Sequence, residues 1–526
     1  MPPDWRALHS FGAAGLARAI AEGRVSAREA VEAHVRRIEE TTPRTNAVVV
    51  TRFEEARAEA ARADERQARG EPIGPLHGVP ITVKESFFLA GTPSTGGLPS
   101  RRGHRAEEDG PLVARLRGAG AIVVGKTNVP QLLLDIETDN PLYGKARNPW
   151  DPDRSPGGSS GGEAANLAAG GAALGLGTDL AGSVRLPAHA CGIHGLMPTS
   201  RRLTLAGTFD ALLSPGQEAL VPQAGPLARR VEDLVLAFSV LAAPGGESPD
   251  PTLPPVPAPA PASKTSVAAL RIGFCVDDGW FPCSPACRRG VTEAAAALAA
   301  RGATVEEFVP PDVPEAMELF FGLMSAAGSG WARRLLAADP VQPRLQELLR
   351  ASNLPRSVSR LLAATLDLAG QPRRARVLRA LGRRSAADYW RMLAARGRYV
   401  ERFLSSEGPG RFDVWIAPPA PTPALRHGAS RFLLGAASYT MLYKLLGVPA
   451  GVVAATRVGP EEEHGRPPSR DPLERTAGEV DAGSAGLPVG VHVAARPWRE
   501  DLVLAVMAAL EEDFRGRPGY PDCPPL

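Results

Sequence analysis

The chain has 526 residues, of which 44% are hydrophobic and 22% charged, and its formal net charge is +3. This composition is typical of a globular protein with an ample core; it excludes a disordered or fibrous chain and argues against a dedicated nucleic-acid binder. The five cysteines are too few and too scattered for a disulfide framework, which favours a reducing compartment. Cys283 and Cys287 lack a matching His or Cys pair nearby, so no zinc site is predicted.

The first third of the chain predicts helices followed by buried strands. Amphipathic helices are expected over residues 12–22 and 27–40, the second with Ser26 as N-cap, and a charged helix over 53–69. Short apolar runs bounded by glycine and proline follow, "GVPITVKES", "AIVVGKTN" and "GLGTDL", with a helix at 161–170. Strands that alternate with helices indicate an α/β fold.

The pattern continues after a proline-rich connection at 249–263. Strand-like "LRIGFCVD" and helix-like "ACRRGVTEAAAALAARGA" follow it at once, so we expect one domain over 1–526. The polar segment 459–486 is expected to be a mobile loop. No stretch reaches the roughly 18 uninterrupted apolar residues of a membrane span, and the N-terminus has no basic leader. We therefore expect a cytoplasmic protein without a transmembrane anchor.

The segment 344–402 contains fourteen arginines and four acidic residues, interleaved with leucines. One interpretation is a solvated helical pair whose arginine stems cover the core. The other is a basic amphipathic surface for anionic lipid or an amphiphilic substrate, which would place the protein peripherally on a membrane. The first is favoured because such patterns are common on ordinary helices.

Two short motifs suggest other chemistry but stand in the wrong context. "GAIVVGKT" from Gly120 has the spacing of a nucleotide-binding P-loop, yet the residues between its glycines are apolar and predict a buried strand. "GSSGG" fits a nucleophile elbow centred on Ser160, but the prolines in the preceding "NPWDPDRSP" exclude the strand that such an elbow must follow.

Three other stretches carry a coherent chemistry. "PLHGVPITVKESF" places Lys84 at the end of an apolar strand, where burial favours the neutral amine, which is a base. "SPGGSSGGE" sets Ser159 and Ser160 among glycines. "GTDLAGSVRLPA" runs from a strand into a glycine-containing turn with Ser183, whose N–H groups can converge on an oxyanion.

These stretches resemble the amidase signature family. In that family a Ser-cisSer-Lys triad carries out the reaction, and the match implies Lys84 as the base, Ser159 as a bridging serine after a cis peptide bond, and Ser183 as the nucleophile. It also implies that no metal or cofactor is needed. The expected oxyanion donors are the backbone N–H groups of Leu180, Ala181, Gly182 and Ser183, and the expected supporting residues are Ser160, Asp179 and Arg185.

Further stretches resemble the fatty acid amide hydrolase branch of that family: "GKTNVPQ", "NPLYGKARNPW", "ASYTMLYKLLGVPAGVV", "GLPVGVHVAARPWRED", and Lys84-Glu85 where most members have Lys-Asp. The resemblance implies a large twisted mixed β-sheet covered by helices on both faces, and a lipophilic amide substrate such as a fatty acid amide or an N-acyl ethanolamine. It leaves room for a homodimer. The acyl channel would be lined by Leu133, Leu134, Ile136, Leu434, Ala437 and Met441.

Some features depart from that pattern and keep alternatives open. Ala181 stands where the family usually has glycine, and the transmembrane helix of the animal enzymes has no counterpart. The alternatives are a broad aryl-acylamide, carbamate or ester hydrolase, and a glutamine amidotransferase subunit that feeds ammonia to a tRNA-linked partner. A catalytically silent binding or scaffold protein would not be expected to keep Lys84, Ser159 and Ser183 together.

Overall fold

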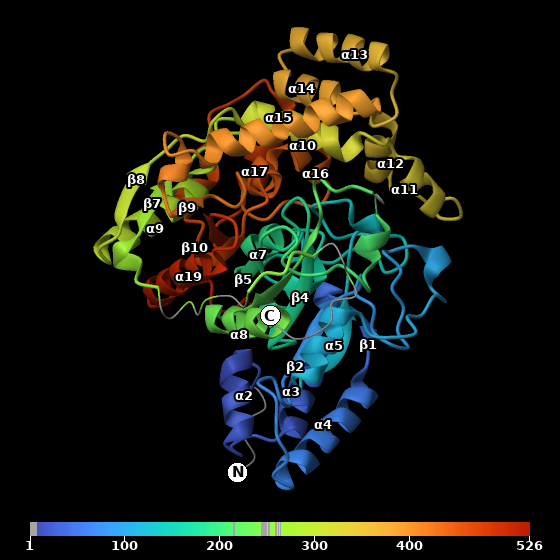
Figure 1. Ribbon diagram of the computed structural model, residues 1–526, viewed down its shortest axis with the longest axis vertical. Helices are drawn as coiled ribbons and strands as arrows, with labels where there is room; N and C mark the ends of the chain where they lie inside the picture. Colours follow the sequence, from blue (N-terminus) through green and yellow to red (C-terminus); the bar gives the residue numbers. More distant parts are fainter. Residues whose placement is uncertain are drawn as a thin grey trace.

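Eleven strands form one mixed β-sheet in the computed structural model, which describes residues 8–213, 216–243, 250, 253–257, 260, 262 and 265–526 (Figure 1). The strands are β1 (Val48–Thr51), β2 (Pro80–Lys84), β3 (Ile122–Thr127), β4 (Leu174–Asp179), β5 (His194–Met197), β6 (Gln223–Ala228), β7 (Arg271–Phe274), β8 (Thr304–Glu307), β9 (Val414–Ala417), β10 (Ala450–Arg457) and β11 (Pro488–Ala495). Their order across the sheet is β1-β3-β2-β4-β6-β5-β10-β11-β9-β7-β8. β2 pairs in parallel with both β3 and β4, which brings the carboxyl ends of these strands to one edge.

Helices connect the strands along the chain. They are α2 (Ala13–Ala21), α3 (Ala27–Thr45), α4 (Phe53–Ala68), α5 (Pro111–Gly118), α6 (Gly161–Ala168), α7 (Arg185–Cys191), α8 (Val231–Leu241), α9 (Pro285–Ala300), α10 (Val313–Ser325), α11 (Gly330–Leu335), α12 (Pro343–Ala351), α13 (Arg356–Leu368), α14 (Pro372–Ala380), α15 (Ala386–Leu404), α16 (Ser430–Leu433), α17 (Ser438–Leu446), α18 (Pro472–Asp481) and α19 (Glu500–Arg515). Short 3₁₀ turns include η3 (Phe209–Leu212) and η8 (Pro460–His464).

Helices cover both faces of the sheet. Successive side chains of a strand point to opposite faces of the sheet, so the neighbours of Val452 and Val453 in β10 show what covers each face. Val452 belongs to an apolar cluster with residues of α6 and α7, whereas Val453 belongs to a cluster with residues of α8 and α19. The predicted α/β fold, a large mixed sheet covered by helices, is confirmed.

The predicted elements of the first third are confirmed with small shifts in their ends. Ser26 caps α3, and its side chain and that of Glu29 exchange hydrogen bonds with each other's backbone N–H groups. The helix continues to Thr45 rather than ending at residue 40. The apolar residues of "GAIVVGKT" form β3, so they make a strand and not a phosphate-binding loop.

Two connecting segments, 459–486 and 249–263, are polar or rich in proline. The segment 459–486 was expected to be a mobile loop, but it contains η8 and α18. Asp471 caps α18 by accepting a hydrogen bond from the Leu473 N–H, and the helix buries an apolar stripe that ends at Val480. Of the proline-rich connection 249–263, residues 249, 251–252, 258–259, 261 and 263 lie outside the described residues.

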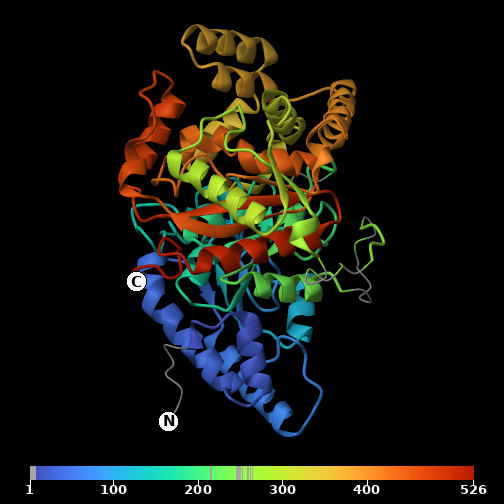
Figure 2. The same ribbon diagram turned by 90° about the vertical axis from the view of Figure 1, so that its left-hand side faces the viewer.

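The arginine-rich segment forms four helices, α12 to α15, rather than a helical pair. Figures 1 and 2 both place α13 and α14 at one end of the molecule's long axis and α2 and α4 at the opposite end. β2 and β4, with the catalytic candidates, lie between these ends (Figure 1). Within the described part of the chain, none of the helices has the length and apolarity that a bilayer-crossing helix requires.

Candidate active site

Lys84 ends β2, a strand whose side chains are all buried. Its Nζ donates hydrogen bonds to Ser159 Oγ at 2.7 Å and to Thr178 Oγ1 at 2.6 Å. Thr178 lies near the end of the parallel neighbour β4, so the sheet itself brings this threonine to Lys84. Lys84 is 0% exposed, unlike most lysines, and therefore cannot be a surface ion-pairing residue.

Ser159 follows a cis peptide bond, Gly158–Ser159, shortly before α6. The loop around it has no room for side chains. A Cβ on Gly158 would lie 2.6 Å from the Asp135 carbonyl oxygen, and a Cβ on Gly157 would lie 2.9 Å from Pro187 Cα. Neighbouring backbone therefore packs directly on the loop and holds Ser159 in place.

Ser183 lies two residues before α7 and is the most accessible of the three triad candidates, at 8% exposed against 2% for Ser159. Ser160 joins the two loops: its N–H donates to the Ser183 carbonyl at 3.1 Å, and its hydroxyl donates to the Thr178 carbonyl at 3.3 Å. Among the hydrogen bonds of the described residues, none links the Ser159 and Ser183 hydroxyls. Such catalytic contacts are often long in unliganded enzymes and tighten when substrate binds.

Asp179 and Arg185 form a fully buried ion pair beneath this turn. Arg185 donates from Nε and Nη2 to the Asp179 carboxylate at 3.0 and 2.9 Å. Burial favours a higher pKa for Asp179, but the charge and hydrogen bonds of Arg185 and the N–H of Val184 lower that pKa to about 2. The same carboxylate accepts from the N–H groups of Gly182 and Val184 at 2.9 and 3.0 Å, so the pair fixes the backbone around Ser183.

The turn offers fewer oxyanion donors than expected. The N–H of Gly182 is already committed to Asp179, which corrects its assignment to the oxyanion hole. The N–H groups of Leu180, Ala181 and Ser183 have no acceptor among the described hydrogen bonds and stay available. Thr440 of α17 donates its hydroxyl to the Ala181 carbonyl at 2.7 Å, which orients the peptide between Ala181 and Gly182.

The surroundings of Lys84 favour a neutral amine. Complete burial lowers the pKa of the Lys84 ammonium to about 8, against the opposing charge of four carboxylates, those of Asp210, Asp179, Glu85 and Glu163. About a tenth of Lys84 is thus unprotonated at pH 7 and about half at pH 8, and the unprotonated amine is the form that accepts a proton.

Burial alone does not distinguish Lys84, because a second buried lysine lies in the next strand. Burial also lowers the pKa of Lys126 in β3 to about 8. Lys126 Nζ donates to the Pro93 carbonyl and, at 2.7 Å, to Ser94 Oγ, and so contacts neither Ser159 nor Ser183. Glu85 accepts from the N–H and hydroxyl of Thr95 at 2.6 and 2.7 Å and makes no ion pair with Lys84 among the described contacts.

The six residues expected to line an acyl channel do not share one cavity. Leu134 and Leu434 line a cavity of about 270 Å³ bordered by α12 and α14. Ile136 and Ala437 line a separate cavity of about 40 Å³ that also touches Gly157 and Leu186, beside the serine loops. Leu133 and Met441 are buried in apolar clusters and line neither of these two cavities.

Sequence reasoning missed two residues close to Lys84. Thr178 could have been found, because it stands in "GTDLAGS" at the end of a strand predicted to neighbour that of Lys84. Asp210 of η3 carried no signal, since its approach depends on a distant contact in which the Phe209 N–H donates to the Ser86 carbonyl at 2.7 Å. Asp210 is 6% exposed and its Oδ2 has no hydrogen-bond partner among the described residues.

The described residues contain no cluster of three or more His, Cys, Asp or Glu side chains suited to a metal ion. The candidate chemistry thus rests on a buried lysine and two serines, Lys84, Ser159 and Ser183, that meet where β2 and β4 end.

Comparison with known proteins agrees with this geometry. A family model described as Amidase matches residues 29–504. Fatty-acid amide hydrolase 1 of Sus scrofa is 38% identical over 454 residues, which cover 85% of this chain and 76% of the pig protein. Fatty acid amide hydrolase 1 of Caenorhabditis elegans is 32% identical over 520 residues, 98% of this chain and 90% of the worm protein. A solved fatty acid amide hydrolase structure superposes with a TM-score of 0.81 at 25% identity, covering 98% of this chain and 87% of that one. The chain therefore belongs to the amidase signature family of amide-hydrolysing enzymes.

Proposed function

We propose that the protein hydrolyses lipophilic carboxamides through an acyl-enzyme formed on Ser183, with Ser159 as proton bridge and Lys84 as base. The observation that carries this proposal is the position of Lys84: a fully buried amine with a 2.7 Å hydrogen bond to Ser159 Oγ. A serine hydroxyl is a weak nucleophile at neutral pH and needs an acceptor for its proton. Neutral Lys84 supplies that acceptor through Ser159.

In the acylation step, Ser183 Oγ attacks the amide carbonyl carbon. Its proton passes to Ser159 Oγ while the Ser159 proton passes to Lys84 Nζ, so that Lys84 becomes the ammonium. The carbonyl oxygen gains the negative charge and is stabilised by the free N–H groups of Leu180, Ala181 and Ser183. Loss of one such donor typically costs about 2.7 to 4 kcal/mol of transition-state stabilisation.

The tetrahedral intermediate collapses when the carbon–nitrogen bond breaks. The proton held by Lys84 returns through Ser159 to the leaving nitrogen, which departs as the neutral amine or ammonia. Water then attacks the ester on Ser183, and its proton follows the same path to Lys84. The carboxylic acid leaves and Ser183 regains its hydrogen, so atoms and protons balance over the cycle without a redox partner.

Two observations support a lipophilic acyl group. The Sus scrofa and Caenorhabditis elegans relatives are named as hydrolases of fatty acid amides. In this chain, the wall of the cavity of about 270 Å³ has an apolar part with Leu134, Phe321 and Leu434, which suits a hydrocarbon chain, and a charged part with Arg344 and Arg373.

A second candidate function has its own support. The cavity beside Gly157 and Leu186, next to the serine loops, measures only about 40 Å³. It has room for a short acyl group and not for a long chain. This favours an aryl-acylamide hydrolase, in which the acyl group is small and the amine is aromatic.

The substrate profile of the purified protein distinguishes these functions. We expect kcat/KM for oleamide to exceed that for acetanilide and acetamide by about 10²-fold or more, because each buried methylene adds binding energy. Ser183→Ala serves as the blank for uncatalysed hydrolysis. A preference for acetanilide would remove the fatty-acid substrate and leave the aryl-acylamide function in its place.

A further inference from the structure

A fully buried arginine, Arg154, stands at the start of the loop that carries Ser159. Arg154 directly precedes "SPGGSSGGE", and its side chain is 0% exposed. Among the described residues its one acidic ion-pair partner is Asp151, which accepts from Nε at 3.2 Å but is itself 31% exposed. A buried charge is costly unless its hydrogen-bonding capacity is satisfied, so the guanidinium needs other acceptors.

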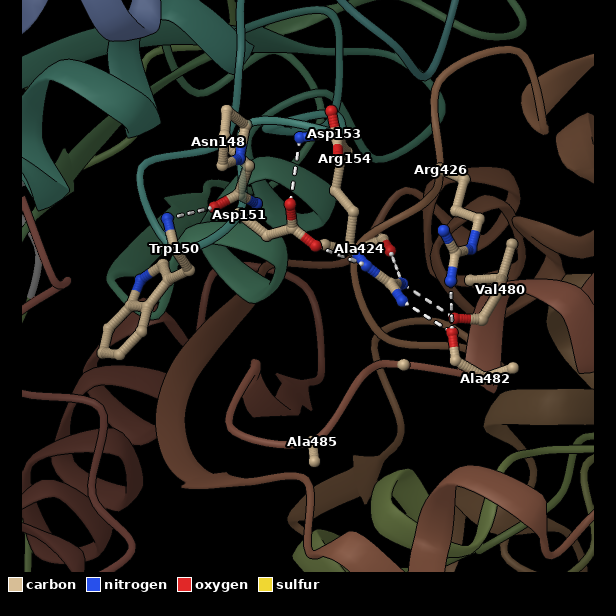
Figure 3. Close-up of polar contacts among 12 residues, drawn as sticks. Asn148, Trp150, Asp151, Asp153, Arg154, Ala424, Arg426, Val480, Ala482 and Ala485 are labelled. Carbon is tan, nitrogen blue, oxygen red and sulfur yellow. Dashed lines mark hydrogen bonds and ion pairs between the residues drawn. The ribbon is translucent and has the colours of Figure 1, made fainter.

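Three backbone carbonyls supply those acceptors (Figure 3). Arg154 Nη1 donates to the carbonyls of Ala424 at 2.9 Å and Val480 at 2.7 Å, and Nη2 donates to that of Ala482 at 3.0 Å. Val480 and Ala482 lie at the carboxyl end of α18, where the helix dipole favours a cation. The planar fork of donors thus fixes Arg154 against two segments that are distant in the sequence.

The backbone on either side of Arg154 extends this clamp toward Ser159. The Asn148 N–H donates to the Arg154 carbonyl at 3.0 Å, and the Ser155 N–H donates to the Leu425 carbonyl at 2.8 Å. The Ser155 hydroxyl then accepts from the Gly157 N–H at 3.1 Å, one residue before the cis peptide bond. These hydrogen bonds, together with the short backbone stretches between them, connect the guanidinium to Gly157 in the loop that carries Ser159.

We propose that Arg154 is a positioning residue for Ser159. Its clamp fixes the start of the serine loop against the 424–425 and 480–482 segments, so that Ser159 Oγ stays within hydrogen-bond reach of Lys84 Nζ. The inference rests on the proposed function, because the effect of Arg154 passes through the proton path of Ser159. Arg154 itself contacts neither the substrate nor the reacting atoms.

The chain offers a matched control at Arg426. Arg426 also donates to the Ala482 carbonyl at 2.6 Å (Figure 3). It donates to the Glu479 carbonyl at 2.9 Å as well, and its backbone pairs with that of Arg154 in an isolated β-bridge. Its side chain is exposed and makes no described hydrogen bond to the serine loop. Each of the variants Arg154→Met and Arg426→Met therefore removes one positive charge. Each also removes hydrogen bonds to carbonyls at the carboxyl end of α18.

The test measures the rate at which a fluorophosphonate acylates Ser183, together with kcat, KM and the pH profile for amide hydrolysis. A misplacement of about 1 Å in a catalytic group can cost about 10²-fold, so we expect Arg154→Met to lower the acylation rate and kcat by about 10- to 100-fold, with KM nearly unchanged. The midpoint of the pH profile should move as well, because Ser159 Oγ would no longer accept from Lys84. Arg426→Met should stay within about 3-fold of the parent by the same reasoning.

Arg154→Lys provides the second variant and keeps the test decisive if Arg154→Met does not fold. Lysine keeps the charge but cannot reach Asp151 and all three carbonyls together, so we expect an intermediate rate, about 3- to 10-fold below the parent. Parental acylation and an unmoved pH midpoint in the folded Arg154 variants would overturn the inference. Equal losses in Arg154→Met and Arg426→Met would also overturn it, because they would indicate a general effect on α18. Absence of Ser183 labelling in the parent would instead refute the proposed function.

Discussion

At the scale of single residues, two buried lysines with similar surroundings have different contacts. Burial lowers the pKa values of Lys84 and Lys126 to about 8 in both cases. Only Lys84 is hydrogen-bonded to a serine of the glycine-rich loop. The hydrogen bond to Ser159, and not the pKa alone, is therefore the reason that Lys84 rather than Lys126 is proposed as the base.

The pH dependence of hydrolysis follows from the state of Lys84. The neutral amine is the active form and its pKa is about 8, so kcat/KM should rise about tenfold per pH unit below that value and level off above it. The carboxylate of Asp210 is the largest opposing influence on this pKa, followed by those of Asp179, Glu85 and Glu163. Asp210→Asn should therefore move the midpoint to lower pH.

Steady-state kinetics from pH 5 to 10 check this expectation in the parent and in Asp210→Asn. A rate that is maximal below about pH 5, where a lysine with this pKa is fully protonated, would contradict a neutral lysine base. An Asp210→Asn profile with a higher midpoint would contradict the electrostatic role given to Asp210.

Residues within local motifs were predictable, and residues that depend on distant contacts were not. Lys84, Ser159 and Ser183 were identified from their own stretches and the family resemblance. Arg154 contacts Ala424 and Val480, which lie more than 250 residues away in the sequence. No local sequence pattern predicts these two contacts. The commitment of the Gly182 N–H to Asp179 likewise needed the folded turn.

At the scale of elements, the arginine-rich helices α12 to α15 have features that fit each of the two interpretations of their sequence. Seven of the fourteen arginines in segment 344–402 form ion pairs with acids: Arg344, Arg356, Arg373, Arg376, Arg379, Arg391 and Arg402. Yet α13 exposes an apolar stripe, with Leu361 at 68% and Leu368 at 91% exposed. Solvated apolar side chains beside unpaired arginines are typical of a surface that contacts lipid.

The lipid interpretation predicts co-sedimentation with vesicles of phosphatidylcholine and phosphatidylserine at low salt. Binding should fall in 0.5 M salt, where charges are screened within about 5 Å, and in the double variant Leu361→Ser and Leu368→Ser. Val309→Ser is the matched control, because Val309 is 78% exposed but lies outside α12–α15. If the protein does not sediment with vesicles at low salt, the lipid interpretation is wrong, and the arginine side chains serve only to cover the core.

The segment 459–486 shows why polar composition misled the prediction at this scale. Its charged and proline-rich start gave no helical pattern, but Leu473, Ala477 and Val480 recur at helical spacing within a short stretch. Arg154 donates to the carbonyls of Val480 and Ala482 at the carboxyl end of α18, so this helix also contributes contacts to the proposed positioning of the Ser159 loop. A short helix with few apolar residues is stabilised mainly by such tertiary contacts, which the sequence does not display.

At the scale of the whole molecule, the sheet and its loops gather the active site from distant parts of the chain. Lys84 comes from β2, Ser159 from the loop before α6, and Ser183 from the turn after β4. Two later segments contact the loops that carry these serines. Thr440 donates to the Ala181 carbonyl before Ser183, and the Val480 carbonyl accepts from Arg154 before Ser159. The fold class was predictable because strands alternate with helices, but this convergence could only be inferred through the resemblance.

In the proposed mechanism, Ser183 carries the acyl group and Lys84 activates it. Mass spectrometry of the protein quenched during turnover of oleamide, followed by peptide mapping, tests this most directly, with a fluorophosphonate as a second acylating probe. We expect modification of Ser183 only in the parent and none in Ser183→Ala. The labelling rate should fall by about 10²-fold or more in Lys84→Met and stay near the parental rate in Lys126→Met. Modification of Ser159 or Ser160 in the parent, or equal labelling rates in the two lysine variants, would contradict it.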